Sequence, residues 1–456
     1  MERTIAAIST PPGPGGIAVI RMSGDKAVEI GDKIFRGGKK LADASSHTVH
    51  YGFIVNGKNE KIDEVLVTVM RAPKTFTRED VVEISAHGGA MSARSVLDAA
   101  IRAGASPAEP GEFTKRAFLN GRIDLSQAEA VIDIINSKNE LSRRSALSQL
   151  EGGLSKEIKK IRGELVRLAA GMQVIIDYPD EELEDVTERD IYDITSACAR
   201  SVKKLLDTAD SGRLIRDGLR VAIVGKPNVG KSSLLNSLAR AERAIVTDVA
   251  GTTRDVIEEY TDLGGVPVIL TDTAGIRETD DIVEKIGVER SQKSIDECDL
   301  AVVMLDGSTL LTDEDMEILR MTAEKQRIIV INKTDLCKPK YAEAIKSKSH
   351  GAAVLETSAV TGIGLDELTD EIKKLYHFGS VAAGSGAVIT NMRHKKALMA
   401  AGEALNRASD AVKSGLPTDM ASLDINEAIN VLGEITGETV SDSVVDEIFH
   451  SFCVGK

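Results

Sequence analysis

The chain has 456 residues, of which 42% are hydrophobic and 28% are charged, and its formal net charge is −14. Its length predicts about three domains. The negative charge argues against a broad nucleic-acid-binding surface, so any RNA contact must be local or shared with a partner. No apolar run approaches the roughly 20 residues of a membrane span, and no signal peptide precedes the first predicted strand.

The four cysteines indicate a reducing compartment. They lie far apart, without a CxxC pair and without a histidine at metal-ligand spacing. We therefore expect reduced thiols in a cytoplasmic protein. The cysteines are Cys198, Cys298, Cys337 and Cys453.

Residues 1–118 predict a compact α/β domain, because short β-rich runs alternate with Gly/Pro-rich turns such as Pro11–Gly16. One helix is predicted at Ser92–Ala103. The predicted strands are Thr4–Ser9, Ile17–Met22, Thr48–Val55, Glu64–Met70 and Val81–Ser85.

Residues 119–215 are predicted to be helical, because apolar side chains recur at helical spacing. Helical sequence returns in residues 379–456, after the small-residue linker Gly379–Gly386. We predict one discontinuous helical domain, and separate N- and C-terminal helical domains are the alternative. The later helices are predicted at Ile191–Ala209, Met392–Ser414, Ala421–Ile435 and Ser443–Phe452.

Residues 216–378 lie between the two helical parts and alternate strands with helices. This order is typical of a doubly wound parallel sheet. The chain is therefore predicted to be multidomain, α/β plus all-α, with a P-loop GTPase inserted into the helical domain. The predicted strands are Leu219–Val224, Val268–Thr271, Leu300–Leu305, Ile328–Ile331 and Ala353–Glu356.

A phosphate-binding loop is predicted at Gly225–Ser232, where GKPNVGKS matches GxxxxGK[ST] between a strand and a helix. Its glycines let backbone N–H groups close around the β-phosphate at a helix N-terminus. Lys231 is expected to reach the β- and γ-phosphates, and the Ser232 hydroxyl to ligate Mg²⁺.

Two further segments complete the predicted phosphate and magnesium site. Asp272–Gly275 ends the next strand, where Asp272 can hold Mg²⁺ through water and the Gly275 N–H can meet the γ-phosphate. Thr253 lies between the two motifs and is the candidate switch threonine on Mg²⁺.

Guanine recognition is predicted from Asn332–Asp335 and Ser358–Ala359, which each follow a strand. The Asp335 carboxylate can accept from guanine N1–H and N2–H₂. Adenine lacks both donors, so ATP would leave the carboxylate unpaired at a cost of about 1–3 kcal/mol. The motifs therefore predict GTP rather than ATP.

The catalytic water lacks its usual partner. Where many regulatory GTPases carry a glutamine, this chain has Ile276, which cannot hydrogen-bond water. Glu284 could orient the water instead. Asn228 could ligate a monovalent cation beside the phosphates, or it could simply stabilise the loop.

Segments outside the nucleotide motifs carry a more specific pattern. They are Thr10–Gly13, Pro110–Thr114, Arg116–Asn120, Asp124–Glu129 and the tail Cys453–Lys456. With them, the chain resembles the tRNA modification GTPase MnmE (TrmE) family along its whole length.

The resemblance implies an N-terminal domain that forms a homodimer and binds a formylated tetrahydrofolate, such as 5-formyltetrahydrofolate. It also implies a GTPase that uses Mg²⁺ and is activated by K⁺ and by pairing of GTPase domains across the dimer. With an FAD-dependent partner, in a heterotetramer, such proteins install a (carboxymethyl)aminomethyl group on C5 of the wobble uridine (position 34) of certain tRNAs, from a tetrahydrofolate one-carbon donor.

The resemblance also implies roles for single residues. The folate would contact Arg21, Glu83, Arg122 and Lys456, although Arg122 replaces the more usual lysine. Cys453 would lie near the folate as an acid or nucleophile, and a free thiol in the tail is the alternative.

In the GTPase domain the resemblance makes Glu284 and Lys231 catalytic. K⁺ would be held by Asn228 with backbone oxygens of Thr247, Val249 and Thr252, and Mg²⁺ by Ser232 and Thr253. The residues expected to bind GTP are Asn228, Val229, Gly230, Lys231, Ser232, Ser233, Thr247, Asp248, Val249, Ala250, Gly251, Thr252, Thr253, Asp272, Thr273, Ala274, Gly275, Asn332, Lys333, Asp335, Ser358 and Ala359.

Two other functions are compatible with the nucleotide motifs. A ribosome-assembly GTPase would tend to carry a KH-like module with a basic GxxG loop after the GTPase domain, whereas acidic helices follow here. A regulatory switch would catalyse no modification itself, and its GTP cycle would only move the active site of a partner.

Overall fold

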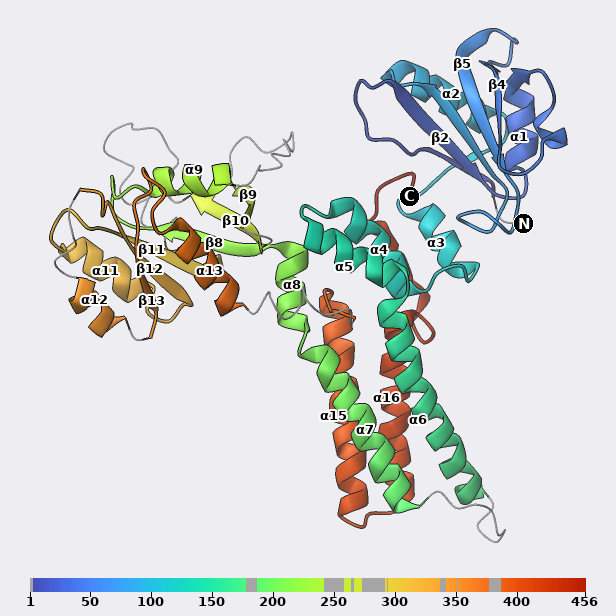
Figure 1. The fold of residues 1–456 in the computed structure, drawn as a ribbon. Coiled ribbons are helices and arrows are strands. Elements are labelled where there is room, and N and C mark those ends of the chain that lie inside the picture. Colours follow the sequence, from blue (N-terminus) through green and yellow to red (C-terminus); the bar gives the residue numbers. More distant parts are fainter. Residues whose placement is uncertain are drawn as a thin grey trace. The chain divides into compact units, whose positions relative to one another are not determined.

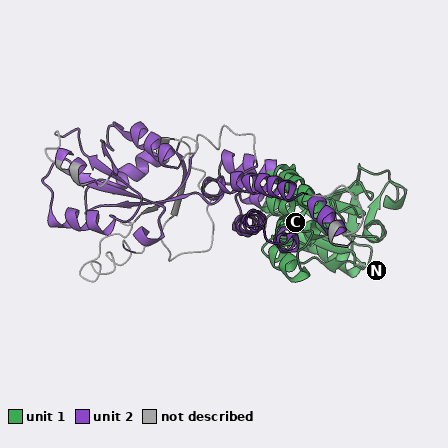
Figure 2. Cartoon of the chain, turned by 90° about the horizontal axis from the view of Figure 1, so that it is seen from below, with its two compact units in different colours: residues 1–132, 149–166, 426–456 green, residues 133–148, 167–425 purple. Residues whose placement is uncertain are grey.

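The computed structural model describes residues 3–177, 187–241, 258–263, 266–272, 292, 294–336, 342–349, 351–376 and 387–456 (Figure 1). Their contacts divide the chain into two compact units (Figure 2). The first unit contains residues 1–132, 149–166 and 426–456, and the second contains residues 133–148 and 167–425. In this part of the chain no helix is both long and apolar enough to cross a membrane.

The first unit begins with a sheet whose strand order is β3-β4-β5-β6-β2-β1-β7, antiparallel except for the parallel pair β1–β7. Helices α1 (Ala27–Ile34) and α2 (Ala90–Arg102) supply buried apolar residues to one core with one face of this sheet. The strands are β1 (Ile5–Ile8), β2 (Ile17–Ser23), β3 (Phe35–Gly37), β4 (Thr48–Val55), β5 (Lys61–Met70), β6 (Val81–His87) and β7 (Ser106–Pro107).

Period-two alternation in β5 shows which face of that strand packs against the core. In β5, Val65 and Val67 are buried while Leu66 between them is exposed. The five strands and the helix predicted from the sequence are present, with ends that differ by up to three residues. The sequence pattern does not predict α1, which has eight residues and no side-chain cap at its N-terminus.

The helical part of the first unit joins segments from both ends of the chain. Leu125 and Ala128 of α4 (Leu125–Asn136) share a buried core with Val445 and Phe449 of α17 (Asp442–His450). The alternative of two separate helical domains is therefore wrong, and the discontinuous domain is confirmed. The same unit holds α3 (Glu112–Leu119), the first part of α6 (Gly153–Asp177) and the last part of α16 (Thr418–Thr436).

The second unit holds the long helices α7 (Glu188–Leu206) and α15 (Met392–Lys413), which pack along each other. Thr187 and Asp190 form a capping box that begins α7. The sequence predicts one helix to Ala209, whereas α7 ends at Leu206 and a separate α8 (Ala209–Asp217) follows. The remaining helix at the start of this unit is α5 (Glu140–Leu150).

The GTPase domain lies in the second unit, and its strand order is β13-β12-β11-β8-β10-β9. All pairs are parallel except β9–β10 at the edge, and buried clusters on both faces of the sheet confirm the doubly wound architecture. The strands are β8 (Leu219–Val224), β9 (Glu258–Leu263), β10 (Val266–Asp272), β11 (Leu300–Asp306), β12 (Arg327–Asn332) and β13 (Ala353–Glu356). The helices are α9 (Lys231–Ala241), α11 (Asp313–Met321), α12 (Ala342–Lys348) and α13 (Leu365–Leu375).

Candidate functional site

The phosphate loop connects β8 to α9, as the sequence predicts. Lys231 Nζ donates to the carbonyl oxygens of Gly225 (2.6 Å) and Lys226 (3.0 Å), so the loop curls around its own lysine. Asn228 and Gly230 have positive φ angles of 62° and 105°. Backbone of this kind points successive N–H groups into one concave surface, which suits a phosphate.

Asn332, at the end of β12, ties this loop to the predicted guanine pocket. Its buried side chain donates from Nδ2 to the Val229 carbonyl (2.9 Å), and its Oδ1 accepts from the Ala359 N–H (2.9 Å). A Cβ atom at Gly230 would lie 2.3 Å from Asn332 Nδ2, so glycine is required at that position. One side chain therefore sets the spacing of the phosphate and base segments.

Lys333 braces the guanine segment against the neighbouring strand. Its Nζ lies 2.7 Å from Oδ2 of Asp306, which ends β11. Burial alone would raise the pKa of the Asp306 carboxyl, but hydrogen bonds from Lys333 and Ser308 outweigh burial and hold that pKa below its usual value. Asp306 therefore stays ionised and fixes Lys333, two residues before the exposed Asp335.

The remaining nucleotide predictions divide into two groups. Ser232 and Ser233 lie in the first turn of α9, and Ser358 with Ala359 follows β13. Asp272 ends β10 opposite Ile223 of β8. The predicted residues Thr247, Asp248, Val249, Ala250, Gly251, Thr252, Thr253, Thr273, Ala274, Gly275 and Glu284 lie outside the described residues.

A second cluster forms where the C-terminal tail meets the N-terminal sheet. Arg21 of β2 and Glu83 of β6 are cross-strand partners, with Nε and Oε1 2.7 Å apart. Arg21 Nη1 also donates to the Gly455 carbonyl at 3.3 Å, and Ser9 Oγ donates to the same oxygen at 3.0 Å. One predicted folate residue, Arg21, thus holds the backbone of the tail, and a second, Glu83, pairs with Arg21.

The other two predicted folate residues, Arg122 and Lys456, lie at a small apolar cluster that Arg21 also contacts. The Arg21 guanidinium lies 5.6 Å from the centre of the Phe113 ring, and Arg122 lies 5.0 Å from that of Phe76. Both rings belong to one cluster of apolar side chains. The Phe113 N–H donates to the Lys456 carbonyl (3.2 Å), so Arg21, Arg122 and the backbone of Lys456 contact this cluster, and Glu83 joins it through its pair with Arg21.

The sequence of the tail fits its close approach to the sheet. Gly455 has a φ of +94°, and a Cβ atom there would lie 2.4 Å from the Ile8 carbonyl oxygen. Val454 forms an isolated β-bridge with Pro110, and the Gly111 N–H donates to the Cys453 carbonyl (3.3 Å). The Cys453 side chain itself is exposed.

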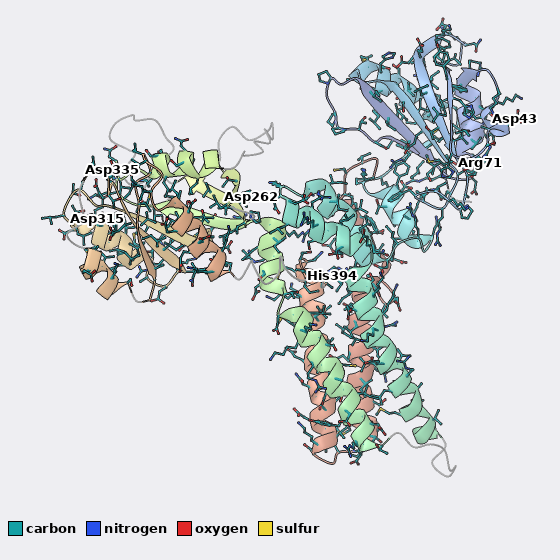
Figure 3. All side chains as sticks on the ribbon, viewed as in Figure 1. Asp43, Arg71, Asp262, Asp315, Asp335 and His394 are labelled. Carbon is teal, nitrogen blue, oxygen red and sulfur yellow. The ribbon has the colours of Figure 1, made fainter. Side chains whose placement is uncertain are left out.

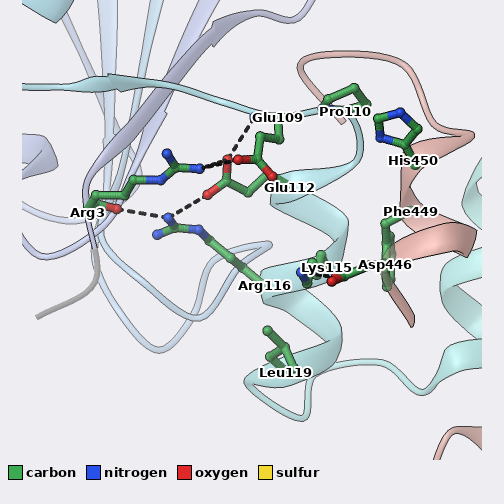
Figure 4. A pocket seen from close by; sticks show the side chains of 10 residues that line it. All are labelled: Arg3, Glu109, Pro110, Glu112, Lys115, Arg116, Leu119, Asp446, Phe449 and His450. Atoms are coloured by element: carbon green, nitrogen blue, oxygen red, sulfur yellow. Dashed lines mark hydrogen bonds and ion pairs between the residues drawn. The ribbon is translucent and has the colours of Figure 1, made fainter. Parts of the chain in front are cut away.

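A cavity of about 480 Å³ lies between α3, α17 and the start of the chain (Figure 4). Its charged side chains pair with one another: Lys115 with Asp446, and Arg3 with Glu109 and Glu112. None of the four predicted folate residues lines it. The Lys115–Asp446 pair links α3 to α17, and so helps to position the tail that follows α17.

Sequence reasoning missed several residues of both clusters. Asp306 carries a signal that could have been used, since it ends a buried strand at the same sheet edge as Asn332. Ser9 carries no such signal, because its partner Gly455 is 446 residues away.

Comparisons with known proteins identify the family of the chain. Residues 4–122 match the model of the GTP-binding protein TrmE N-terminus, and residues 125–453 match that of the MnmE helical domain. The tRNA modification GTPase MnmE of Acetivibrio thermocellus is 49% identical over 456 residues, which cover 100% of this chain and 99% of the relative. The protein of the same name from Listeria welshimeri is 50% identical and covers 99% of each chain.

Among solved structures, Era of Aquifex aeolicus bound to GDP and AlF4⁻ is similar to part of the chain. It is 30% identical, covers 41% of this chain and 66% of its own, and has a TM-score of 0.29. The two family models and the full-length relatives show that the chain belongs to the tRNA modification GTPase MnmE family, and that its central domain is a P-loop GTP hydrolase.

Proposed function

We propose that this chain uses GTP hydrolysis to support modification of tRNA. With an FAD-dependent partner, it installs a (carboxymethyl)aminomethyl group on C5 of the wobble uridine, with a tetrahydrofolate as one-carbon donor. The observation that carries this proposal is the tail clamped against the Arg21–Glu83 pair, in the same chain as the GTP-binding motifs. The name of the full-length relatives, tRNA modification GTPase, supports the choice of substrate.

The folate proposal rests on the chemistry of the tail cluster. Glu83 offers a carboxylate to the donor edge of a pterin ring, and Arg21 holds that carboxylate in place. Phe113 and Phe76 supply apolar surface beside it, while Arg122 and Lys456 suit the carboxylates of the folate glutamate. Cys453 is then an exposed thiol three residues before Lys456, near the bound one-carbon unit.

The homodimer proposal rests on apolar side chains that are exposed on two strands of the N-terminal sheet. Val49, Tyr51 and Leu66 are 59%, 59% and 48% exposed on β4 and β5. Val49 pairs with Thr68, which pairs with Glu83, and paired residues share a face of a sheet. The apolar residues and the proposed folate pair therefore lie on one face, where a second copy would cover both.

The nucleotide proposal assigns roles to residues of the phosphate loop. The loop N–H groups and Lys231 bind the phosphates, and Ser232 holds Mg²⁺ together with Thr253. Bound Mg²⁺ supplies positive charge to the β- and γ-phosphate oxygens. Asn228 holds K⁺ with backbone oxygens of Thr247, Val249 and Thr252, and Glu284 orients the water in place of the missing glutamine.

The partner proposal follows from the chemistry of the modification. Forming the group on uridine C5 needs a redox step, and the sequence has no GxGxxG dinucleotide-binding loop after a strand. The FAD-dependent partner therefore supplies the redox chemistry. The local tRNA contact that the net charge allows is shared with that partner.

Nucleoside analysis of tRNA tests the proposal. A strain that lacks the gene should lose the wobble-uridine modification, and the intact gene should restore it. A gene with Lys231→Ala or without residues 453–456 should not restore it. An unchanged nucleoside profile in the deletion strain would refute the proposed function.

The regulatory-switch alternative has its own outcome in that experiment. Cys453→Ser should abolish modification while leaving GTP turnover and partner binding intact. If Cys453→Ser restores modification fully, the tail thiol takes no part in the chemistry and the switch explanation is favoured.

Potassium dependence tests the nucleotide roles separately. GTP turnover in KCl should exceed turnover in NaCl at matched ionic strength. The reason is that a K⁺ ion near the phosphates would stabilise the negative charge of the transition state, as an arginine finger does in other GTPases. Glu284→Ala should keep K⁺-dependent self-association but lose hydrolysis, whereas Asn228→Ala should lose both responses. Equal rates in the two salts would remove the cation from the mechanism.

A further inference from the structure

Asp315 lies in the first turn of α11 (Figure 3), and its buried carboxylate contacts Lys226 of the phosphate loop. Its Oδ2 accepts three donors: the Thr312 N–H (2.9 Å), the Thr312 hydroxyl (2.8 Å) and Lys226 Nζ (3.0 Å). Within the part of the chain that the structure describes, its Oδ1 is buried and has no hydrogen-bond partner. The carboxylate thus joins a helix cap to a charge pair.

Lys226 carries this contact into the nucleotide site. It is the second residue of the phosphate loop, and its side chain is only 15% exposed. Its carbonyl oxygen accepts from Lys231 Nζ at 3.0 Å. Asp315 therefore fixes the side chain of a residue whose backbone holds the phosphate-binding lysine.

A helix cap alone does not explain this geometry. An uncharged asparagine at position 315 could also accept from Thr312, although its NH₂ group would then be buried in the place of the unpaired oxygen. The N-terminus of α11 favours the negative charge of Asp315, and the ion pair with Lys226 is the contact that a helix cap does not require.

We propose that Asp315 is a positioning residue of the GTPase: through Lys226 it holds the phosphate loop in the shape that presents Lys231 to the nucleotide. The proposal rests on nucleotide binding by the phosphate loop, and on none of the potassium, folate or partner proposals. A movement of α11 would then shift the phosphate loop and the position of Lys231 relative to the phosphates.

Four variants of the full chain separate this role from helix capping. Asp315→Asn keeps acceptors for Thr312 but loses the charge. Lys226→Met removes the positive partner of the same ion pair, whereas Lys226→Arg can keep the ion pair with Asp315. Thr312→Val is the matched control, because it removes the cap and leaves the pair.

Affinity for a fluorescent GDP analogue and the melting temperature are measured for each variant. Asp315→Asn and Lys226→Met should each weaken GDP binding about tenfold, and the double variant should be no weaker, because both changes break one interaction. Lys226→Arg should bind within about twofold to threefold of the unchanged chain. Thr312→Val should lower the melting temperature and leave GDP affinity intact.

Two results would overturn the proposal. Normal GDP affinity in Lys226→Met would show that the pair does not shape the loop. Equal losses of GDP affinity in Thr312→Val and Asp315→Asn would make the role structural. If Asp315→Asn fails to fold, Lys226→Met and Lys226→Arg still decide the question, since neither touches the cap.

Discussion

The nucleotide site and the tail cluster are built in opposite ways. The nucleotide site collects loops that follow β8, β12 and β13, at one edge of a parallel sheet. The tail cluster joins Ser9 and Arg21 to Gly455, across more than four hundred residues of chain, and Glu83 pairs with Arg21. The first site is ordered by strand topology, and the second depends on a few contacts made by the last residues of the chain.

This difference predicts how each site fails. A substitution in one loop of the nucleotide site should alter the role of that loop and leave the other loops in position, since each loop is anchored by a buried strand. A change in the tail should move several proposed folate contacts together, because Gly455 and Lys456 are held mainly through backbone atoms. The predictions below test this contrast.

The largest expected effect is on base selection. Asp335→Asn should weaken GTP binding about a hundredfold or more, because a site built to pair with base N–H donors loses its acceptor. Binding of xanthosine triphosphate should rise, since the new amide can donate to the extra carbonyl of xanthine. Competition binding with the two nucleotides measures both changes.

Ser358→Ala provides the control for that variant, because it keeps the backbone contact expected for the base. Its preference for GTP should be unchanged. If Asp335→Asn also kept its preference for GTP, Asp335 would lie outside the guanine pocket.

A smaller loss of nucleotide affinity is expected for Asn332, whose side chain is hydrogen-bonded to two loops. Asn332→Ala removes the hydrogen bonds to Val229 and Ala359, and buried groups left without partners cost about 1–3 kcal/mol. GTP and GDP affinity should therefore fall together by about tenfold to a hundredfold, without a change of base preference. Calorimetric titration with both nucleotides measures this. A loss for GTP alone would contradict the bracing role.

The tail cluster should respond to a single methyl group. Gly455→Ala places a Cβ atom against the Ile8 carbonyl and strains a left-handed backbone, so the tail should detach. Affinity for 5-formyltetrahydrofolate should fall about tenfold, while GTP turnover stays unchanged. Calorimetry with the folate and a phosphate-release assay measure the two quantities.

Gly38→Ala is the matched control, since a Cβ atom at Gly38 meets nothing within 4 Å and its φ is not in the left-handed region. It should leave folate affinity unchanged. Full folate affinity in Gly455→Ala, or in a chain without residues 453–456, would refute the folate pocket.

The two sites also differ in how far the sequence could predict them. Strand ends and motif order place Lys231, Asn332 and Ala359 at one sheet edge, because parallel strands in this topology leave no other arrangement. No periodicity or spacing places Gly455 beside Arg21, and the tail cluster was predicted only from the resemblance to a family. The Lys226–Asp315 pair was missed because Asp315 lies on the polar first turn of a helix, where acidic residues are common.

The smallest expected effect is a pH dependence in the N-terminal sheet, at the end of β6 beyond Glu83. The exposed His87 donates through Nδ1 to the largely buried Asp63 at 2.6 Å, and this hydrogen bond and the charge of Asp63 raise the pKa of His87 above 6.5. Glu64 acts in the same direction, while burial opposes it slightly. A raised pKa in the folded state means that protonated His87 stabilises the fold below pH 6.5, and that this contribution is lost as the pH rises through the folded-state value.

The midpoint of the His87 ring signals in an NMR titration should therefore lie above pH 6.5, and Asp63→Asn should return that midpoint toward 6.5. Because His87 and Asp63 lie outside both clusters, GTP turnover should not follow this titration. A His87 that titrates at or below pH 6.5 in the unchanged chain would show that the Asp63 contact does not hold in solution.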